Sequence, residues 1–216
     1  MRDKIKERKE KNKRMDEAKV EALCEHLKRM GLDATVVKFK KRLFLSDWPG
    51  IIVTGAARIA NRNIDLVELA WYMVESGGTP EAPNYETKYR CNYVVRAKVQ
   101  GLEDWLKVEL KPVRKGFLKR EIVDLKWEEK VLSSINLAQV LNSDSDLKHY
   151  FLSHRRPPNV EIEPYKKHQC VRIWQKYSYD SSEAAFPTIE NFEAYDRIAK
   201  HVRSTLLRTV AELIKN

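Results

Sequence analysis

The chain has 216 residues, 43% of them hydrophobic and 9% aromatic, which is enough to fill the core of one large globular domain or two small ones. No apolar run approaches the ~20 residues that cross a bilayer, and the first residues lack the apolar centre of a signal peptide. The missing apolar run excludes a membrane-spanning protein. The net charge is +10, and the three cysteines are far apart, which excludes a disulfide framework. We expect a cytosolic chain with reduced thiols.

The positive charge is concentrated in two segments. Residues 1–14 contain eight Lys or Arg and three acids, giving +5, residues 38–42 add +4, and the rest of the chain sums to about +1. We interpret these segments first as a solvated helix end and a lysine-protected edge strand. The alternative is a nucleic-acid-binding protein. Its candidate contacts are Lys4, Lys6, Arg8, Lys9, Lys38, Lys40, Lys41 and Arg42.

The first element predicted after the basic segment is an amphipathic helix. Val20, Leu23, Leu27 and Met30 recur at helical spacing, and Gly31 follows as a stop. Short apolar runs separated by charged or Asp-Trp-Pro-Gly punctuation are typical of strands. Such runs cover residues 34–39, 42–46 and 50–54.

Residues 63–76 are predicted to form a second helix, because apolar residues recur at helical spacing from Ile64 to Val74 and two glycines then end it. The Gly- and Pro-containing stretch that follows is predicted to be a linker. The expected organisation is a basic helix end or tail at 1–14, a small helix–strand–helix region at 15–76, the linker at 77–88 and an antiparallel α+β domain at 89–216.

Beyond the linker, alternating apolar and charged residues predict a hairpin around Gly101 with one solvated face. Two short helices are expected later, the second capped by Ser143 or Asp144. The predicted strands are 89–100, 105–113, 120–127, 159–164 and 169–177, with the two short helices between the third and fourth of them.

A long amphipathic helix is predicted at the end of the chain, introduced by Pro187 and Thr188. Its apolar stripe consists of Phe192, Tyr195, Ile198, Val202, Leu206, Val210 and Leu213. The last turns of this helix need a further apolar surface, which the N-terminal helix or a second subunit would supply. Of these two alternatives we favour the second subunit, which would make the protein a homodimer.

These elements define an α+β protein with antiparallel sheets flanked by helices. From residue 64 onward the predicted order is helix, three strands, helices, two strands and helix. This order resembles the α-βββ-α-ββ-α plan of type III secretion chaperones. The resemblance lies in the order of the elements, and it implies a binding module rather than an enzyme.

The stretch "IIVTGAARIANRN", residues 51–63, is similar to the strand and Thr-Gly turn that open a dinucleotide-binding enzyme. That turn needs further glycines so that the backbone approaches the pyrophosphate, whereas Ile59 and Asn61 stand at the later positions. We therefore expect no cofactor. The alternative interpretation is a buried strand that runs into a polar loop, with Asn61 or Asn63 capping the next helix.

Glu109 and Lys111 are the strongest catalytic candidates. An acid and a lysine two residues apart share one face of a strand, as in many metal-dependent nucleases. A metal clamp also requires a second carboxylate from a neighbouring strand, and the preceding predicted strand offers Arg96 and Lys98 there. We therefore interpret Glu109 and Lys111 as part of a solvated strand face, with nuclease activity as an outside alternative.

No metal site is predicted. Asn142, Asp144 and Asp146 alternate as at the start of a calcium loop, but Leu147 and Ser153 occupy the positions of its glycine and its bidentate acid. A helix-to-helix corner capped by short acidic side chains accounts for these residues more simply. The leading prediction for function is a non-catalytic cytosolic interaction module that binds a protein partner or itself.

Overall fold

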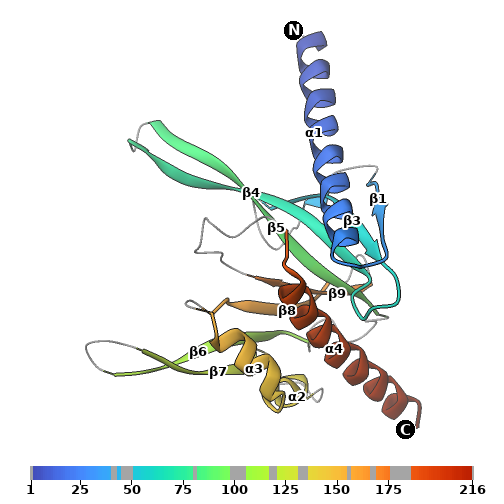
Figure 1. Ribbon diagram of the computed structural model, residues 1–216, viewed down its shortest axis with the longest axis vertical. Coiled ribbons are helices and arrows are strands. Elements are labelled where there is room, and N and C mark those ends of the chain that lie inside the picture. Colours follow the sequence, from blue (N-terminus) through green and yellow to red (C-terminus); the bar gives the residue numbers. More distant parts are fainter. Residues whose placement is uncertain are drawn as a thin grey trace. The chain divides into compact units, whose positions relative to one another are not determined.

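The computed structural model describes most of the chain (Figure 1). The described residues are 2–39, 43–44, 51–79, 82–97, 106–116, 121–130, 136–154, 157–165, 169–175 and 186–215. Within them, side chains are not described at 2–13, 43–44, 74, 78, 83, 85, 87 and 208–215.

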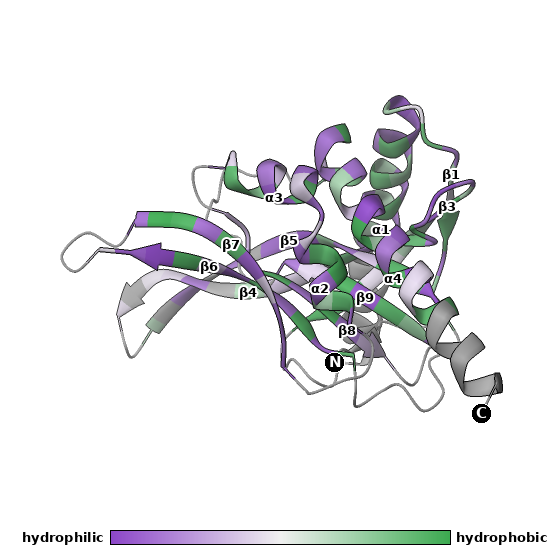
Figure 2. Ribbon diagram, turned by 90° about the horizontal axis from the view of Figure 1, so that it is seen from below, coloured by the Kyte–Doolittle hydropathy of each residue, from purple (hydrophilic) through white to green (hydrophobic). Residues whose placement is uncertain are grey.

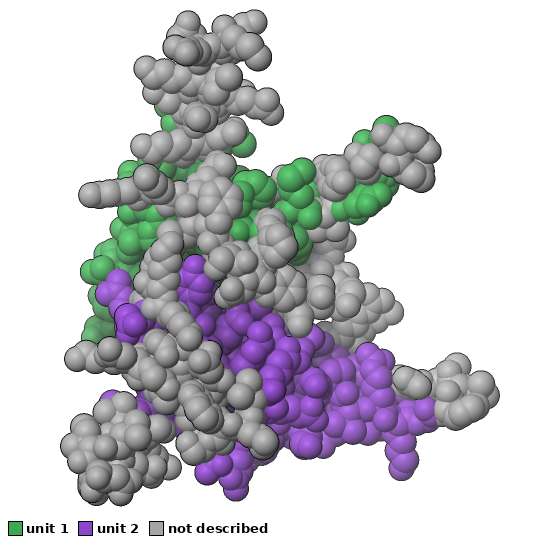
Figure 3. Space-filling view, turned by 180° about the vertical axis from the view of Figure 1, so that it is seen from behind, with its two compact units in different colours: residues 1–61, 66–92, 184–188 green, residues 62–65, 93–183, 189–216 purple. Residues whose placement is uncertain are grey.

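The chain divides into two compact units (Figure 3). Unit 1 comprises residues 1–61, 66–92 and 184–188, and unit 2 comprises residues 62–65, 93–183 and 189–216. None of these boundaries lies within 77–88, the stretch that the sequence predicts as a linker.

Unit 1 is built from one long helix and antiparallel strands. The elements are α1 (Arg2–Arg29), β1 (Ala34–Val37), β2 (Leu43–Phe44), β3 (Ile52–Ile59), β4 (Leu66–Thr79) and the first part of β5 (Ala82–Arg96). Strand β3 pairs with β1, β2 and β4, antiparallel in each case. The predicted apolar face of α1 is confirmed, since Val20, Leu23 and Leu27 are buried, and Gly31 adopts a φ of 83° just beyond the helix.

Gly55 lies inside β3 and has a packing role. A β-carbon built on Gly55 would lie 2.7 Å from Cγ2 of Val20, so the missing side chain lets α1 approach the strand closely. The strand continues past Gly55 to Ile59 and pairs with another strand. The residues that resemble a phosphate-binding turn are therefore part of a sheet.

The helix predicted at 63–76 is wrong, because this stretch contains most of β4. Consecutive residues of β4 are buried, among them Val67, Glu68 and Leu69. A strand that is buried on both faces does not alternate apolar and polar residues, and its apolar run matches a helical pattern equally well.

The stretch predicted as a linker contains the end of β4 and the start of β5. The helix that would open a secretion-chaperone-like order is thus absent from the described residues.

Unit 2 contains a five-stranded antiparallel arrangement. Its strands are the end of β5 (Tyr93–Arg96), β9 (Cys170–Gln175), β8 (Val160–Tyr165), β6 (Val108–Lys115) and β7 (Glu121–Glu129), paired in that order. The turn predicted around Gly101 lies outside the described residues, and β5 and β6 do not pair, because β9 and β8 lie between them. Figure 2 shows hydrophobic and hydrophilic bands along β6 and β7; the buried residues are the first three of β6, Val108 to Leu110, and Leu125 and Trp127 of β7.

Three helices cover one face of these strands: α2 (Leu137–Asn142), α3 (Ser145–Leu152) and α4 (Ile189–Lys215). The predicted long C-terminal helix is confirmed, and its stripe is buried from Phe192 to Leu206. Tyr195 stacks on Tyr93 of β5, with ring centroids 4.2 Å apart. The side chains of Val210 and Leu213 lie outside the described residues. The predicted α+β class with antiparallel strands is confirmed. No helix in the described ranges is long and apolar enough to cross a membrane.

Candidate functional site

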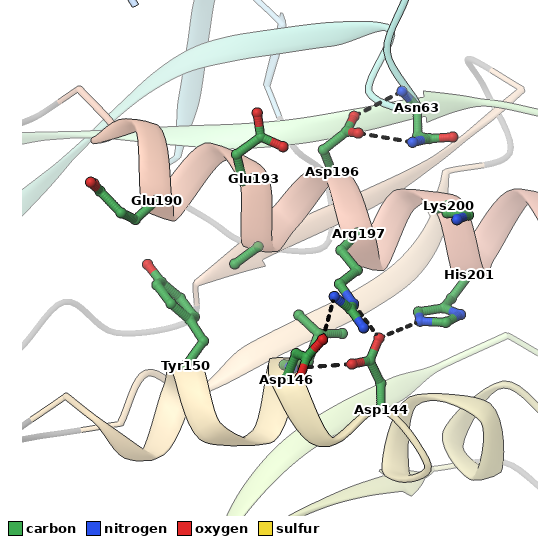
Figure 4. Close-up of a pocket in the computed structure, with 12 residues that line it drawn as sticks. Asn63, Asp144, Asp146, Tyr150, Glu190, Glu193, Asp196, Arg197, Lys200 and His201 are labelled. Atoms are coloured by element: carbon green, nitrogen blue, oxygen red, sulfur yellow. Dashed lines mark hydrogen bonds and ion pairs between the residues drawn. The ribbon is translucent and has the colours of Figure 1, made fainter.

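A polar groove of about 510 Å³ lies in unit 2 between α3 and α4 (Figure 4). Leu147 of α3 and Ala194 of α4 contribute apolar surface to it. Its acidic residues are Asp144, Asp146, Glu190, Glu193 and Asp196, and its basic residues are Arg197, Lys200 and His201. With a neutral histidine the lining carries five negative and two positive charges.

Asp144 fixes the geometry of the α3 side of the groove. It is the N-cap of α3, where its Oδ1 accepts a hydrogen bond of 3.1 Å from the Leu147 amide. Its Oδ2 lies 2.6 Å from Nε of Arg197 and 2.7 Å from Nε2 of His201. Burial raises the pKa of Asp144, but the bonds from Arg197, His201 and the Leu147 amide outweigh burial and hold the pKa at about 2. Asp144 is therefore an anion at neutral pH, and it joins α3 to α4.

Asp196 fixes the turn on the other side of α4. Its carboxylate accepts hydrogen bonds of 2.8 to 2.9 Å from the backbone amides of Asn63 and Ile64 and from the Asn63 side chain. Arg203 holds the same turn by donating to the Asn63 carbonyl over 2.8 Å and to the Asp65 carboxylate over 2.5 Å. Both carboxylate oxygens of Asp196 are thus used to position the backbone.

The acids at the rim of the groove are accessible. The Asp146 side chain is 72% exposed and contacts Arg197 over 2.9 Å. Glu193 is 47% exposed and forms an ion pair of 3.0 Å with Arg62, and Glu190 is exposed in the first turn of α4. These three carboxylates can meet a ligand without disturbing the caps made by Asp144 and Asp196.

The groove has few of the groups that covalent catalysis uses. His201 and Asp144 form a pair like that of a general base, but the same carboxylate oxygen also accepts from Arg197. Among the described residues that line the groove there is no serine or cysteine. Across the described part of the chain, no three His, Cys, Asp or Glu are grouped as metal ligands.

Glu109 faces a second carboxylate that sequence analysis missed. It pairs in register with Glu161 on β8, and both side chains are buried. Nζ of Lys130 lies 3.0 Å from Glu109 and 2.5 Å from Glu161. The ammonium thus occupies the space between the two carboxylates, where a metal ion would have to bind.

A second lysine and a third carboxylate lie beside this pair. Lys107 lies 3.2 Å from Glu163 of β8, two residues beyond Glu161. Burial lowers the pKa of Lys130, but its bonds to Glu161 and Glu109 outweigh burial and raise the pKa. Lys111 lies apart, in an ion pair of 3.0 Å with Glu128 of β7, and its side chain is 47% exposed.

The predicted nucleic-acid contacts are only partly described. Lys4, Lys6, Arg8 and Lys9 belong to α1, but their side chains lie outside the described set. Lys38 lies 3.6 Å from Glu21, and both side chains are exposed. Lys40, Lys41 and Arg42 lie outside the described residues.

Two tyrosine rings pack against cations of their own unit. Lys19 lies over the ring of Tyr89, 3.6 Å from its centroid, and Arg172 lies over Tyr165 at 4.0 Å. Such rings contribute packing within the unit to which they belong, Tyr89 in unit 1 and Tyr165 in unit 2.

Comparison with known proteins gives no family assignment: no protein-family model, no curated protein and no solved structure matches the chain. The function must therefore be argued from the site itself.

Proposed function

We propose that the chain is a non-catalytic cytosolic interaction module, and that the α3–α4 groove of unit 2 binds a basic segment of a protein. The observation that carries this proposal is the excess of acids in the groove, five against two permanent cations. Opposite charges across an interface raise the association rate and select the partner.

The two buried acids favour a groove that is formed before its partner arrives. Asp144 and Asp196 are engaged with the α3 amide, with α4 and with the turn at Asn63. Because the backbone on both sides is held in place, little ordering entropy is lost on binding. Asp146, Glu190 and Glu193 are then the residues that would contact lysine or arginine side chains.

A fluorescent decapeptide of alternating Lys and Ala tests the proposal by anisotropy titration. The protein carries a net charge of +10, so binding of this cationic probe must arise from a local acidic surface. We expect the triple variant Asp146→Asn, Glu190→Gln, Glu193→Gln to bind at least about tenfold more weakly, as expected when several ion pairs are lost.

The matched control is the triple variant Glu25→Gln, Glu75→Gln, Glu121→Gln, which removes the same charge from exposed positions elsewhere. It should bind the peptide like the wild type. Equal weakening in both triple variants, or no binding by the wild type, would contradict the proposed groove.

Nucleic-acid binding is a second candidate function, because α1 begins at Arg2 and the eight cations of residues 1–14 therefore belong to one helix. Binding to duplex DNA should then weaken steeply with salt, as counterions are released, and deletion of residues 2–14 should abolish most of it. Undiminished binding after the deletion would exclude the helix.

Metal-dependent nuclease activity is the least supported function, since Lys130 occupies the space between Glu109 and Glu161. Magnesium-dependent cleavage that is lost in Glu109→Gln would reverse this ranking.

A further inference from the structure

The first half of α1 carries a concentrated positive charge. Residues 1–14 hold eight cations and three acids, and α1 runs without a break from Arg2 to Arg29. Among the residues of α1 whose side chains are described, from Arg14 onward, the buried ones are Val20, Leu23, Cys24 and Leu27. Figure 1 shows the first half of α1, in dark blue, extending past β1 and β3 of unit 1.

The order of charges along this half gives the helix a basic side. Acids occur at positions 3, 7 and 10, and residues three and four apart share a face of a helix. The three acidic positions therefore lie along one stripe. Seven of the eight basic positions, all except Arg14, lie outside that stripe.

We propose that the first half of α1 of one molecule docks into the α3–α4 groove of a second copy of this chain. This inference rests on the proposed function of the groove, and it names the occupant. The argument is charge complementarity: the groove has an excess of three negative charges, and residues 1–14 have an excess of five positive charges. Because each molecule has both surfaces, we infer a two-fold dimer in which each groove holds the helix of the other molecule.

The interface would combine ion pairs with some apolar contact, since Leu147, Ala194 and Tyr150 line the groove beside the charged side chains. A single groove of this size gives a small contact, which belongs with weak, transient interfaces. Its affinity should also fall as salt screens the ion pairs, since the Debye length shortens from about 10 Å at 0.1 M to about 3 Å at 1 M.

Sedimentation velocity of the full chain over a wide concentration range tests this inference. The wild type should associate reversibly in low salt. The groove variant Asp146→Lys, Glu190→Lys, Glu193→Lys and the helix variant Lys4→Glu, Arg8→Glu, Lys11→Glu should each raise the dimer dissociation constant roughly 10- to 100-fold. Mixed together, the two variants should form a heterodimer, because each restores the charge that the other has lost. Unchanged circular dichroism and thermal midpoints establish that both variants are folded.

Three results would overturn the inference: a wild type that is monomeric throughout, association that survives in both variants, or a mixture that does not associate. A monomeric wild type whose groove binds the Lys-Ala peptide would reject this occupant and leave the proposed function standing. If deletion of residues 2–14 abolishes DNA binding and leaves association unchanged, the helix binds nucleic acid and the inference is wrong.

Discussion

Arg197 in the middle of α4 donates a hydrogen bond of 2.6 Å from its Nε to the carboxylate of Asp144, which begins α3. The Asp144 side chain is only 3% exposed and that of Arg197 is 45% exposed, so the carboxylate is shielded from water while the guanidinium group reaches the solvent. One buried carboxylate thus caps one helix, binds a second helix and forms one wall of the groove. The integrity of the groove depends on this residue.

Asp144→Asn should destabilise unit 2. Asparagine remains a good N-cap, but it loses the negative charge that accepts from Arg197 and His201. Hydrogen bonds to charged groups contribute about 1.5–3 kcal/mol, and we expect a loss in that range, measured by urea unfolding at pH 7. The control is Asp146→Asn, whose side chain is 72% exposed and which should cost under about 0.5 kcal/mol. Equal losses in the two variants would contradict the role of Asp144.

The contribution of Asp144 should disappear in acid. Its pKa in the folded protein is about 2, below the ordinary value of 3.8, so the folded state favours the carboxylate. The stabilisation is fully present above about pH 4 and is lost as the pH falls toward 2. The difference in unfolding free energy between wild type and Asp144→Asn should therefore shrink between pH 5 and pH 3. A difference that is constant across this range would show that charge is not its source.

Lys130→Met should be among the most destabilising single substitutions in unit 2. It leaves Glu109 and Glu161 facing each other, and removing one partner of a buried ion pair typically costs about 3–5 kcal/mol. The triple variant Lys130→Met, Glu109→Gln, Glu161→Gln removes all three charges and should recover much of this loss. Chemical denaturation of both proteins tests the prediction, which fails if the triple variant is the less stable of the two.

Gly55→Ala should destabilise unit 1, although alanine ordinarily suits a strand better than glycine. The added methyl group would lie 2.7 Å from Cγ2 of Val20, and such overpacking costs about 1–3 kcal/mol. Val20→Ala removes the obstructing atoms. The double variant should therefore be more stable than the sum of the two single losses predicts. Strict additivity would mean that the contact between α1 and β3 is not tight.

Local signals in the sequence predicted several elements of unit 2 correctly. The stripe from Phe192 to Leu206 defines α4 because an amphipathic helix repeats its apolar residues every three to four positions. Ser143 or Asp144 was predicted as the cap of α3, because short polar side chains satisfy free amides at helix starts, and Asp144 is the N-cap. These signals depend only on neighbours along the chain.

Pairing between distant segments could not be predicted from the same signals. Asp144 and His201 are 57 residues apart, and nothing local indicates that α3 and α4 lie side by side. Glu161 was missed because β6 was expected to pair with the preceding strand β5, whereas β6 lies between β7 and β8. Strand order depends on the packing of the whole sheet, and this explains why Glu109 was interpreted as solvated and why the groove was not foreseen.

Amide chemical shifts recorded during titration with the Lys-Ala decapeptide test the central claim most directly. We predict saturable shifts concentrated at residues 144–150 and 190–201, which surround the groove, with little change along β7 at residues 121–129. The shifts should be absent in the triple variant Asp146→Asn, Glu190→Gln, Glu193→Gln. Saturable shifts centred away from α3 and α4, or the same shifts in that variant, would contradict the assignment of this groove as the binding surface.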